Sequence, residues 1–129
     1  MEGTVGMADG TLTGVNGVLV WTDGRQFGAM LAFYRNVLGL TPRSEKEQFV
    51  NFEWGDFRLS IAVHSGVEGR NRDPLRFMLN FGVDDIHAAY ERLTAAGVAF
   101  TRRPEQEPWG GWVATFADPD GNTLQLLQP

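Results

Sequence analysis

The sequence predicts an α+β fold of two β-α-β-β-β modules whose strands form a curved mixed sheet, a cup. Three observations predict it. The order of strand, helix and strands occurs twice; the two helical stretches end at Gly39 and Gly97; and each half closes with a hairpin pattern, around Gly55 and Gly121. Because a module of about 55 residues is too small to bury both faces of its own sheet, we expect the two modules to share one core.

The composition favours one compact domain. The 129 residues are 43% hydrophobic and 21% charged, and they include no cysteine, so no disulfide framework is expected. We expect a flexible leader over 1–13 and a single domain over 14–128, with modules at 14–64 and 75–128. The net charge of −5 argues against a nucleic-acid partner. No apolar run approaches a membrane span and no signal peptide precedes the domain, so we expect a cytoplasmic protein without a membrane partner.

The first module begins with a β-rich run over 15–21, which stops at a turn that can also cap the next helix, Thr22-Asp23-Gly24. Apolar residues then recur at helical spacing, which predicts a helix over 25–38. Strict alternation predicts strands over 49–54 and 57–62. The polar stretch 64–74 is expected to be a loop.

The second module repeats this order. Alternation predicts a strand over 75–83, and the acidic pair Asp84-Asp85 predicts the start of a helix that ends at Gly97. A strand is expected over 98–101. A terminal hairpin is expected over 112–127, turning at Asp118-Pro119-Asp120-Gly121.

One helix per module can cover only one face of the sheet. Polar residues that alternate with the apolar ones should therefore line the opposite, concave face. They are Arg58, Ser60, Arg76 and Asn80.

Two motifs give these modules a family resemblance. Phe-Tyr-Arg-Asn-Val-Leu-Gly-Leu at 33–40 and Asp-Pro-Asp-Gly-Asn at 118–122 resemble the vicinal oxygen chelate superfamily, the group of glyoxalases, bleomycin resistance proteins and extradiol dioxygenases. The resemblance covers about residues 14–128 and implies the cup-shaped fold. It also implies several functions, since the superfamily contains metal-dependent lyases, isomerases, dioxygenases and thiol transferases as well as metal-free proteins that sequester antibiotics.

The resemblance places the family's metal-ligand positions at Asn16, Met78, Gln125, and either Arg58 or Ser60. None of these side chains is an imidazole or a carboxylate, the groups that hold zinc, iron, nickel or manganese. We therefore expect no metal and no cofactor. The two histidines, His64 and His87, lack ligand spacing, and Asp56, Asp118 and Asp120 sit in turn sequences, so these residues are interpreted as capping, surface or turn residues.

The remaining candidates suit an organic ligand, because aromatic rings supply apolar walls and neutral polar groups orient a molecule. Several alternatives stay open. Trp109 either stacks on a ligand or is structural; Trp21 and Trp54 either cover a rim or fill a dimer contact; and Arg76 either binds an anion or pairs with Asp73. The ligand-binding set that we expect is Asn16, Trp54, Arg58, Ser60, Arg76, Met78, Asn80, Trp109, Trp112 and Gln125.

The leading hypothesis is a metal-free homodimer that binds a small aromatic or amphipathic molecule, similar to the drug-sequestering branch of the family. The alternative is a lyase, isomerase or dioxygenase relative that uses a displaced metal, or only Arg58 and Arg76 as electrostatic stabilisers. A third alternative is a structural or regulatory module whose cup is filled by its partner chain or by its own leader.

Overall fold

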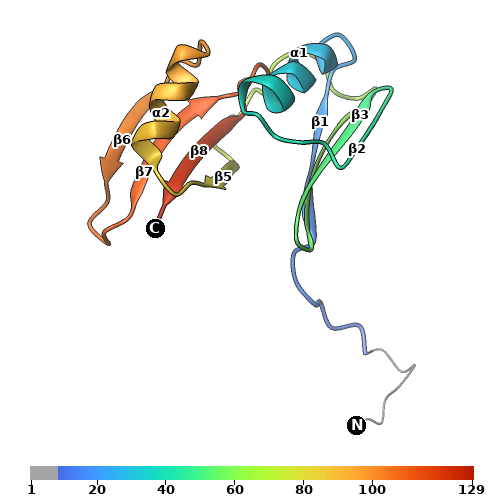
Figure 1. Cartoon of the computed structure of the whole chain (residues 1–129). Helices are drawn as coiled ribbons and strands as arrows, with labels where there is room; N and C mark the ends of the chain where they lie inside the picture. The colour runs from blue at the N-terminus through green and yellow to red at the C-terminus, as the bar shows by residue number, and fades with distance from the viewer. Residues whose placement is uncertain (1–8) are drawn as a thin grey trace.

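A computed structural model describes residues 9–129 as two β-α-β-β-β modules, one after the other (Figure 1). The N-terminal module comprises β1 (Gly17–Thr22), α1 (Phe27–Ala32), a π-helical turn η1 (Phe33–Val37), β2 (Ser44–Lys46), β3 (Phe49–Trp54) and β4 (Phe57–Val63). The C-terminal module comprises β5 (Met78–Gly82), α2 (Ile86–Ala95), β6 (Arg102–Gln106), β7 (Trp112–Ala117) and β8 (Thr123–Gln128). The predicted α+β class and the duplicated order of elements are confirmed.

Each module forms its own four-stranded mixed sheet. The N-terminal sheet has the order β1-β4-β3-β2 and the C-terminal sheet the order β5-β8-β7-β6. In each, the first strand of the module runs parallel to the last, and the hairpins are antiparallel. Strands β1 and β5 are therefore edge strands, each with one side unpaired, as are β2 and β6 at the opposite edges. The two sheets are separate within the described chain.

The two modules share one hydrophobic core, as their size predicts. Its centre joins Tyr34 and Phe52 of the N-terminal module to Phe116 and Leu124 of the C-terminal module, all almost fully buried. Rings from both modules meet there, with the centroids of Phe33 and Phe116 separated by 6.3 Å. The faces of both sheets that carry helices are thus turned toward a common interior.

Buried hydrogen bonds also join the modules, at the turn that connects β7 and β8. The hydroxyl of Tyr34 donates to Oδ2 of Asp118 over 2.7 Å, and that of Thr22 donates to Oδ2 of Asp120 over 2.6 Å. Burial raises the pKa of Asp118, and burial beside this carboxylate raises the pKa of Tyr34 well above its ordinary value. Asp118 and Asp120 are turn residues, as predicted, and they also tie the second module to the first.

The helices follow the sequence closely, with two differences in the first. The stretch predicted as a single helix over 25–38 starts only at Phe27, and it is α1 followed by the π turn η1, in which Leu38 N–H donates to the carbonyl of Phe33. Helix α2 begins as predicted at Asp85, whose side chain accepts from the N–H of Ala88. Its end is a Schellman motif with Gly97 at a φ of 99°.

Three strand predictions are corrected in their bounds. The strand predicted over 15–21 is β1, which starts at Gly17 and ends at Thr22. Residues 98–101 are not a strand, because the N–H of Val98 completes the helix cap by donating to Leu93; β6 starts at Arg102 instead. The strand predicted over 75–83 starts only at Met78. The preceding residues form a turn in which Arg76 N–H donates to Asp73.

The leader predicted over 1–13 lies partly outside the described residues. Residues 9–13 are exposed and carry no regular secondary structure. In the part of the chain that the structure describes, no helix is both long enough and apolar enough to cross a membrane.

Candidate functional site

Each sheet has one face that no helix of its module covers, which we call its open face. On the N-terminal sheet, strand pairing aligns Leu19 with Ser60 and Asn51, and Trp21 with Ala62 and Phe49. The apolar neighbours of these residues, such as Leu59 and Ile61, face the shared core. Residues paired across a sheet share a face, so this set forms the N-terminal open face.

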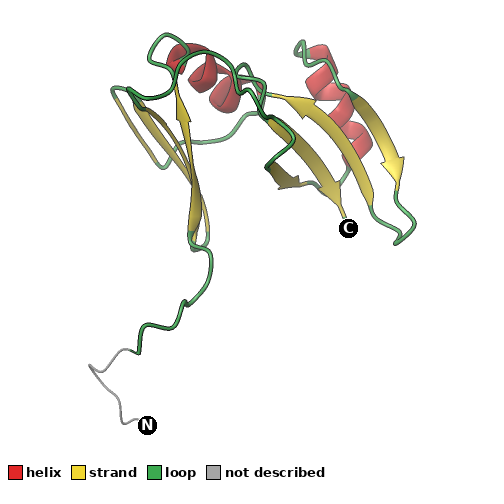
Figure 2. Cartoon of the chain, turned by 180° about the vertical axis from the view of Figure 1, so that it is seen from behind, coloured by secondary structure: helices red, strands yellow, loops and turns green. Residues whose placement is uncertain are grey.

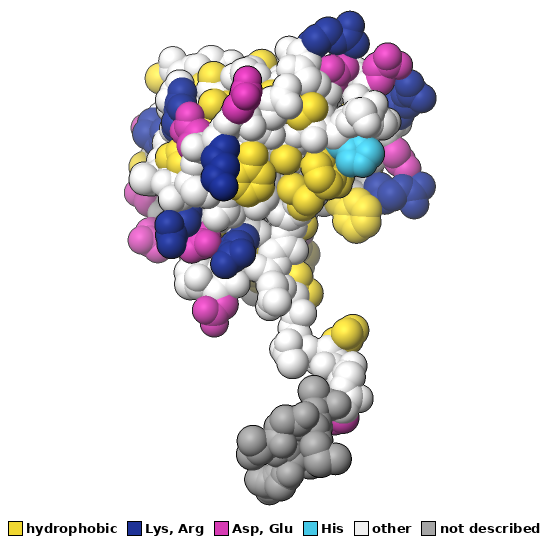
Figure 3. Space-filling view, turned by 90° about the vertical axis from the view of Figure 1, so that its right-hand side faces the viewer, with side chains coloured by type: hydrophobic (Ala, Val, Ile, Leu, Met, Phe, Trp, Pro, Cys, Tyr) yellow, Lys and Arg dark blue, Asp and Glu magenta, His cyan; other side chains and the backbone are white. Residues whose placement is uncertain are grey.

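On strands β1, β4 and β3 the N-terminal open face changes from apolar to charged along the strands. One row holds Trp21, Ala62 and Phe49, with Lys46 beside Phe49 on the outer strand β2; the middle row holds Leu19, Ser60, Asn51 and Ser44; the last row holds Gly17, Arg58 and Glu53. Trp21 is 43% exposed, and its ring lies edge-on to His64 with centroids 4.9 Å apart. On this side of the molecule Figure 3 shows a band of hydrophobic side chains that ends beside a histidine, with charged side chains around it.

Polar side chains of this face are connected in a chain. The hydroxyl of Ser60 donates to Oδ1 of Asn51 over 3.1 Å, and the amide of Asn51 donates to Oε2 of Glu53 over 3.3 Å. Glu53 also forms ion pairs with two arginines, with Nε of Arg58 at 3.0 Å and Nε of Arg43 at 3.5 Å. These contacts hold the buried Asn51 in place, so a fixed polar row crosses the middle of the face.

The C-terminal open face is built in the same way. Its middle row aligns Asn80, Gln125, Thr115 and Arg102 across the sheet. The amide of Gln125 donates to Oδ1 of Asn80 over 2.8 Å. Arg102 on the outer strand is already paired with two carboxylates, Glu105 and Glu107. The part of this row near β5, formed by Asn80, Gln125 and Thr115, is therefore neutral and polar.

The two open faces do not enclose a cup within one chain. Both sheets turn their helix-covered faces toward the shared core, so both open faces point away from it. Figures 1 and 2 show the sheets as two splayed arms joined at one end, with α1 packed near the junction. Each open face can therefore become part of a closed cup only if a surface from outside this chain packs against it.

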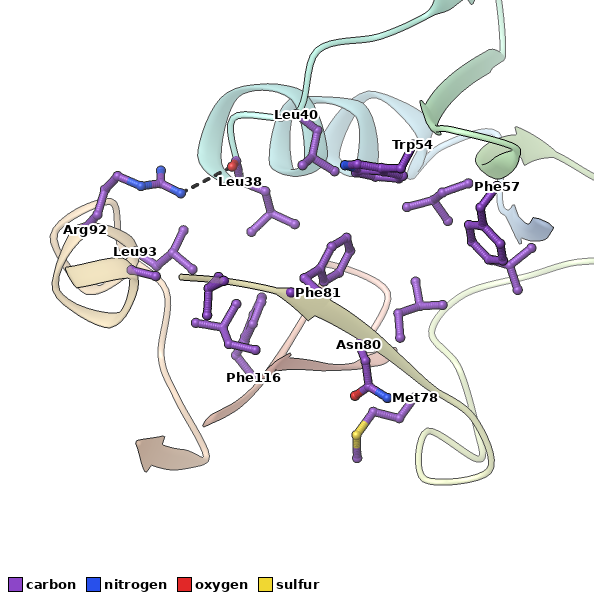
Figure 4. Close-up of a pocket in the computed structure, with 17 residues that line it drawn as sticks. Leu38, Leu40, Trp54, Phe57, Met78, Asn80, Phe81, Arg92, Leu93 and Phe116 are labelled. Carbon is purple, nitrogen blue, oxygen red and sulfur yellow. Dashed lines mark hydrogen bonds between the residues drawn. The ribbon is translucent and has the colours of Figure 1, made fainter. Parts of the chain in front are cut away.

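A different hollow lies between the arms, on the core side. This inner cavity has a volume of about 680 Å³ and is mainly apolar. Trp54 and Phe81 point toward one another across it, with ring centroids 6.4 Å apart (Figure 4). Its one guanidinium, that of Arg92, donates to the carbonyls of Val37 and Leu38. The cavity therefore offers few polar groups that could orient a ligand.

The structure brings five of the expected ligand-binding residues onto open faces. Arg58 and Ser60 lie on the N-terminal one, and Met78, Asn80 and Gln125 on the C-terminal one. Met78 and Asn80 also border the inner cavity, and in Figure 4 their side chains point away from it.

The other five lie elsewhere. Trp54 and Trp112 fall on the helix-covered faces, because they alternate with the open-face residues of β3 and β7; the Trp112 ring packs against His87. Asn16 precedes β1 and lines a shallow depression, and Arg76 lies in the turn before β5, paired with Asp73 at 2.7 Å. Trp109 lies in the β6–β7 loop, 62% exposed, with its ring over Gly111.

Sequence reasoning did not include several open-face residues in the ligand-binding set. Trp21 and Leu19 are exposed apolar side chains that alternate with the partly buried Val18 and Val20, and this alternation was the available signal. Asn51 had the same signal, since it alternates with Val50 and Phe52. Arg43 carried no signal, because it lies outside any strand.

The open faces do not fit the metal site of the family's metal enzymes. Parallel pairing puts Leu19 beside Ser60, and Gly17 beside Arg58, so neither register provides an imidazole or a carboxylate. In the C-terminal module the matching positions are Met78 and Gln125. Within residues 9–129, no three His, Cys, Asp or Glu side chains come together to hold a metal ion.

Comparison with known proteins agrees with this fold. Residues 24–126 match the model of the Glyoxalase/Bleomycin resistance protein/Dioxygenase superfamily. The chain is 30% identical to a bleomycin resistance protein of Klebsiella pneumoniae over 113 residues, 81% of this chain and 85% of the relative. It is 28% identical to a lactoylglutathione lyase of Haemophilus influenzae over 109 residues, 76% of this chain and 81% of that one.

A solved structure of a glyoxalase-related enzyme from Fulvimarina pelagi is similar in fold, with a TM-score of 0.74 and 24% identity. The similarity covers 92% of this chain and 89% of that one. Fold, duplicated modules and sequence similarity together establish that the chain belongs to the glyoxalase/bleomycin resistance protein/dioxygenase superfamily.

Proposed function

We propose that this protein binds a small aromatic or amphipathic organic molecule without a metal ion, as a homodimer. The observation that carries the proposal is the make-up of the open faces, where the positions of the family's metal ligands hold Ser60 or Arg58, Met78 and Gln125. Amide, hydroxyl and thioether groups neither neutralise a divalent cation nor bind it tightly. The same groups suit a neutral polar edge of an organic ligand.

The apolar part of the N-terminal open face supplies the second half of such a site. Trp21, Leu19 and His64 present an exposed aromatic and aliphatic surface next to the half-buried Ser60, which is hydrogen-bonded to the buried Asn51. Aromatic ligands stack on such rings, and a nearby polar group orients their substituents. The chain is similar both to a bleomycin resistance protein and to a lactoylglutathione lyase, so the choice of binding over catalysis rests on the residues of the open faces.

A second copy of the chain would complete the cup. The two open faces of one chain point away from each other, so each needs the complementary face of another chain. We place the N-terminal open face of one protomer beside the C-terminal open face of its partner, with β1 of the first next to β5 of the second. A two-fold axis then produces two identical cups.

Exposed apolar residues at both edge strands support this arrangement. Val15, ahead of β1, is 79% exposed, and Leu75 and Phe77, ahead of β5, are 82% and 83% exposed. Large apolar side chains clustered at unpaired strand edges are a liability for a monomer and are commonly covered by a partner.

The test is a binding panel on protein of known oligomeric state. Light scattering should give twice the chain mass at micromolar concentration, and calorimetry should detect at least one aromatic or amphipathic ligand with a stoichiometry of one per chain. Trp21→Ala should weaken binding, whereas the control Trp109→Ala, in a loop away from the open faces, should leave it unchanged. A monomer, or uniformly absent binding at high micromolar ligand, would overturn the proposal.

A further inference from the structure

We infer that the ligand is an amphipathic anion, bound with its acidic group at Arg58 and Arg43 and its apolar body on Trp21. This inference rests on the proposed binding function and specifies its ligand class and orientation. It follows from the order of the rows on β1, β4 and β3 of the N-terminal open face, from an apolar row through a neutral row to a row that ends in two cations; the one cation beside the apolar row, Lys46, lies on the outer strand β2, away from Trp21 on β1.

The two arginines form a partly satisfied cationic site. Both contact the single carboxylate of Glu53 through Nε, so two positive charges share one negative charge. Both side chains are 68% exposed. Neither guanidinium makes a hydrogen bond to any residue of the described chain 9–129. Guanidinium groups with free donors bind carboxylates and phosphates in a two-pronged manner.

Two guanidinium groups and two carboxylates meet at this end of the face. Asp56, in the hairpin turn, lines the same shallow depression as Glu53 and Arg58 but forms no ion pair with either arginine in the described chain, so the unused donors of Arg58 and Arg43 are the feature that favours an acid here. The carboxylates of the C-terminal open face, Glu105 and Glu107, bind Arg102 near its outer strand, far from the β5 edge. The remaining polar groups of the middle rows are neutral.

The spacing of the rows sets the length of the ligand. Trp21 lies four residue steps along β1 from Gly17, which shares the row of Arg58, and at about 3.3 Å per step this is roughly 13 Å. Side chains lean and rotate, so an aryl ring joined to an acid by a chain of about five methylenes spans the two ends. 6-Phenylhexanoate has this form.

The experiment compares three probes with the same phenylalkyl body and a negative, neutral or positive head group: 6-phenylhexanoate, its primary amide and 6-phenylhexylamine. Calorimetry at low salt should give the acid roughly tenfold higher affinity than the amide, with the amine weakest, because two charge-assisted hydrogen bonds are specific to the acid. Arg58→Gln and Arg43→Gln should each reduce acid affinity about five- to tenfold and leave amide affinity unchanged. The control Arg35→Gln also removes one positive charge and one ion pair, with Glu45, but lies on η1 and should change neither.

Equal affinity for the acid and the amide, or a preference for the amine, would overturn the inference while leaving the binding function intact. The same holds if Arg35→Gln weakens acid binding as much as Arg58→Gln, since the effect would then be one of overall charge. If neither these probes nor any compound of the wider aromatic panel binds, the proposed function itself fails. Urea unfolding of each variant verifies that the fold is retained.

Discussion

The hydrogen bond between Tyr34 and Asp118 should be a principal support of the joint between the modules. Tyr34 is completely buried, and its hydroxyl donates to Oδ2 of Asp118 over 2.7 Å. In Tyr34→Phe this bond is lost, but Asp118 keeps the amide of Asn122 on Oδ2 and the N–H groups of Asp120 and Asn122 on Oδ1. No donor is left unsatisfied. The free energy of unfolding should therefore fall by about 1.5–2 kcal/mol, the low end for a bond to a charged group.

Asp118→Ala should lower the free energy of unfolding more than Tyr34→Phe does, although aspartate is a smaller side chain than tyrosine. It removes all four hydrogen bonds and leaves the buried Tyr34 hydroxyl without a partner, so we expect a loss of about 3–5 kcal/mol. Urea unfolding followed by circular dichroism measures both losses. If Asp118→Ala cost no more than Tyr34→Phe, the buried hydrogen bonds would not be what stabilises the joint.

Three further predictions concern pH, strand contact and helix capping. Because the pKa of Tyr34 is raised in the folded protein, the unfolded chain loses its proton first, and stability should fall by about 1.4 kcal/mol per pH unit above pH 10; Tyr34→Phe should lack this part of the alkaline loss in pH-dependent unfolding. Gly17→Ala should destabilise by about 1–3 kcal/mol, since its Cβ would lie 2.5 Å from the carbonyl oxygen of Arg58, whereas Gly82→Ala, on the other edge strand, has open space and should cost under about 1 kcal/mol. Asp85→Ala should cost about 1 kcal/mol through loss of the α2 cap, and Asp85→Ser should retain most of that stability in thermal unfolding; an equal loss in both would refute the capping role.

Much of the fold was predictable because its signals are local. Alternation located β3 and β4, glycines marked the helix ends, and Asp85 marked the start of α2. The predictions that were wrong lay where tertiary contacts decide. Residues 98–101 resemble a strand in sequence, but the Schellman motif uses their first N–H; Leu75 and Phe77 alternate correctly but have no partner strand.

The candidate site was predicted in part for the same reason. Strand alternation correctly assigned Ser60 and Asn80 to the side away from the helices, because this depends only on neighbours in sequence. The same alternation places Trp54 and Trp112 on the helix-covered faces of their sheets. They were included in the ligand-binding set because they are aromatic, and not because of their position in the strand. That the open faces point apart depends on how the modules pack, and no local pattern encodes it.

The central claim, that binding needs no metal, is tested most directly by one calorimetric titration performed twice. The protein is purified without a polyhistidine tag, treated with chelator and dialysed, and the best ligand of the aromatic panel is titrated in with and without added Zn²⁺, Mn²⁺, Ni²⁺ and Fe²⁺. We predict the same affinity and a stoichiometry of one ligand per chain in both conditions. Binding that appears only when a metal is added would contradict the account and indicate a metal-dependent member of the superfamily.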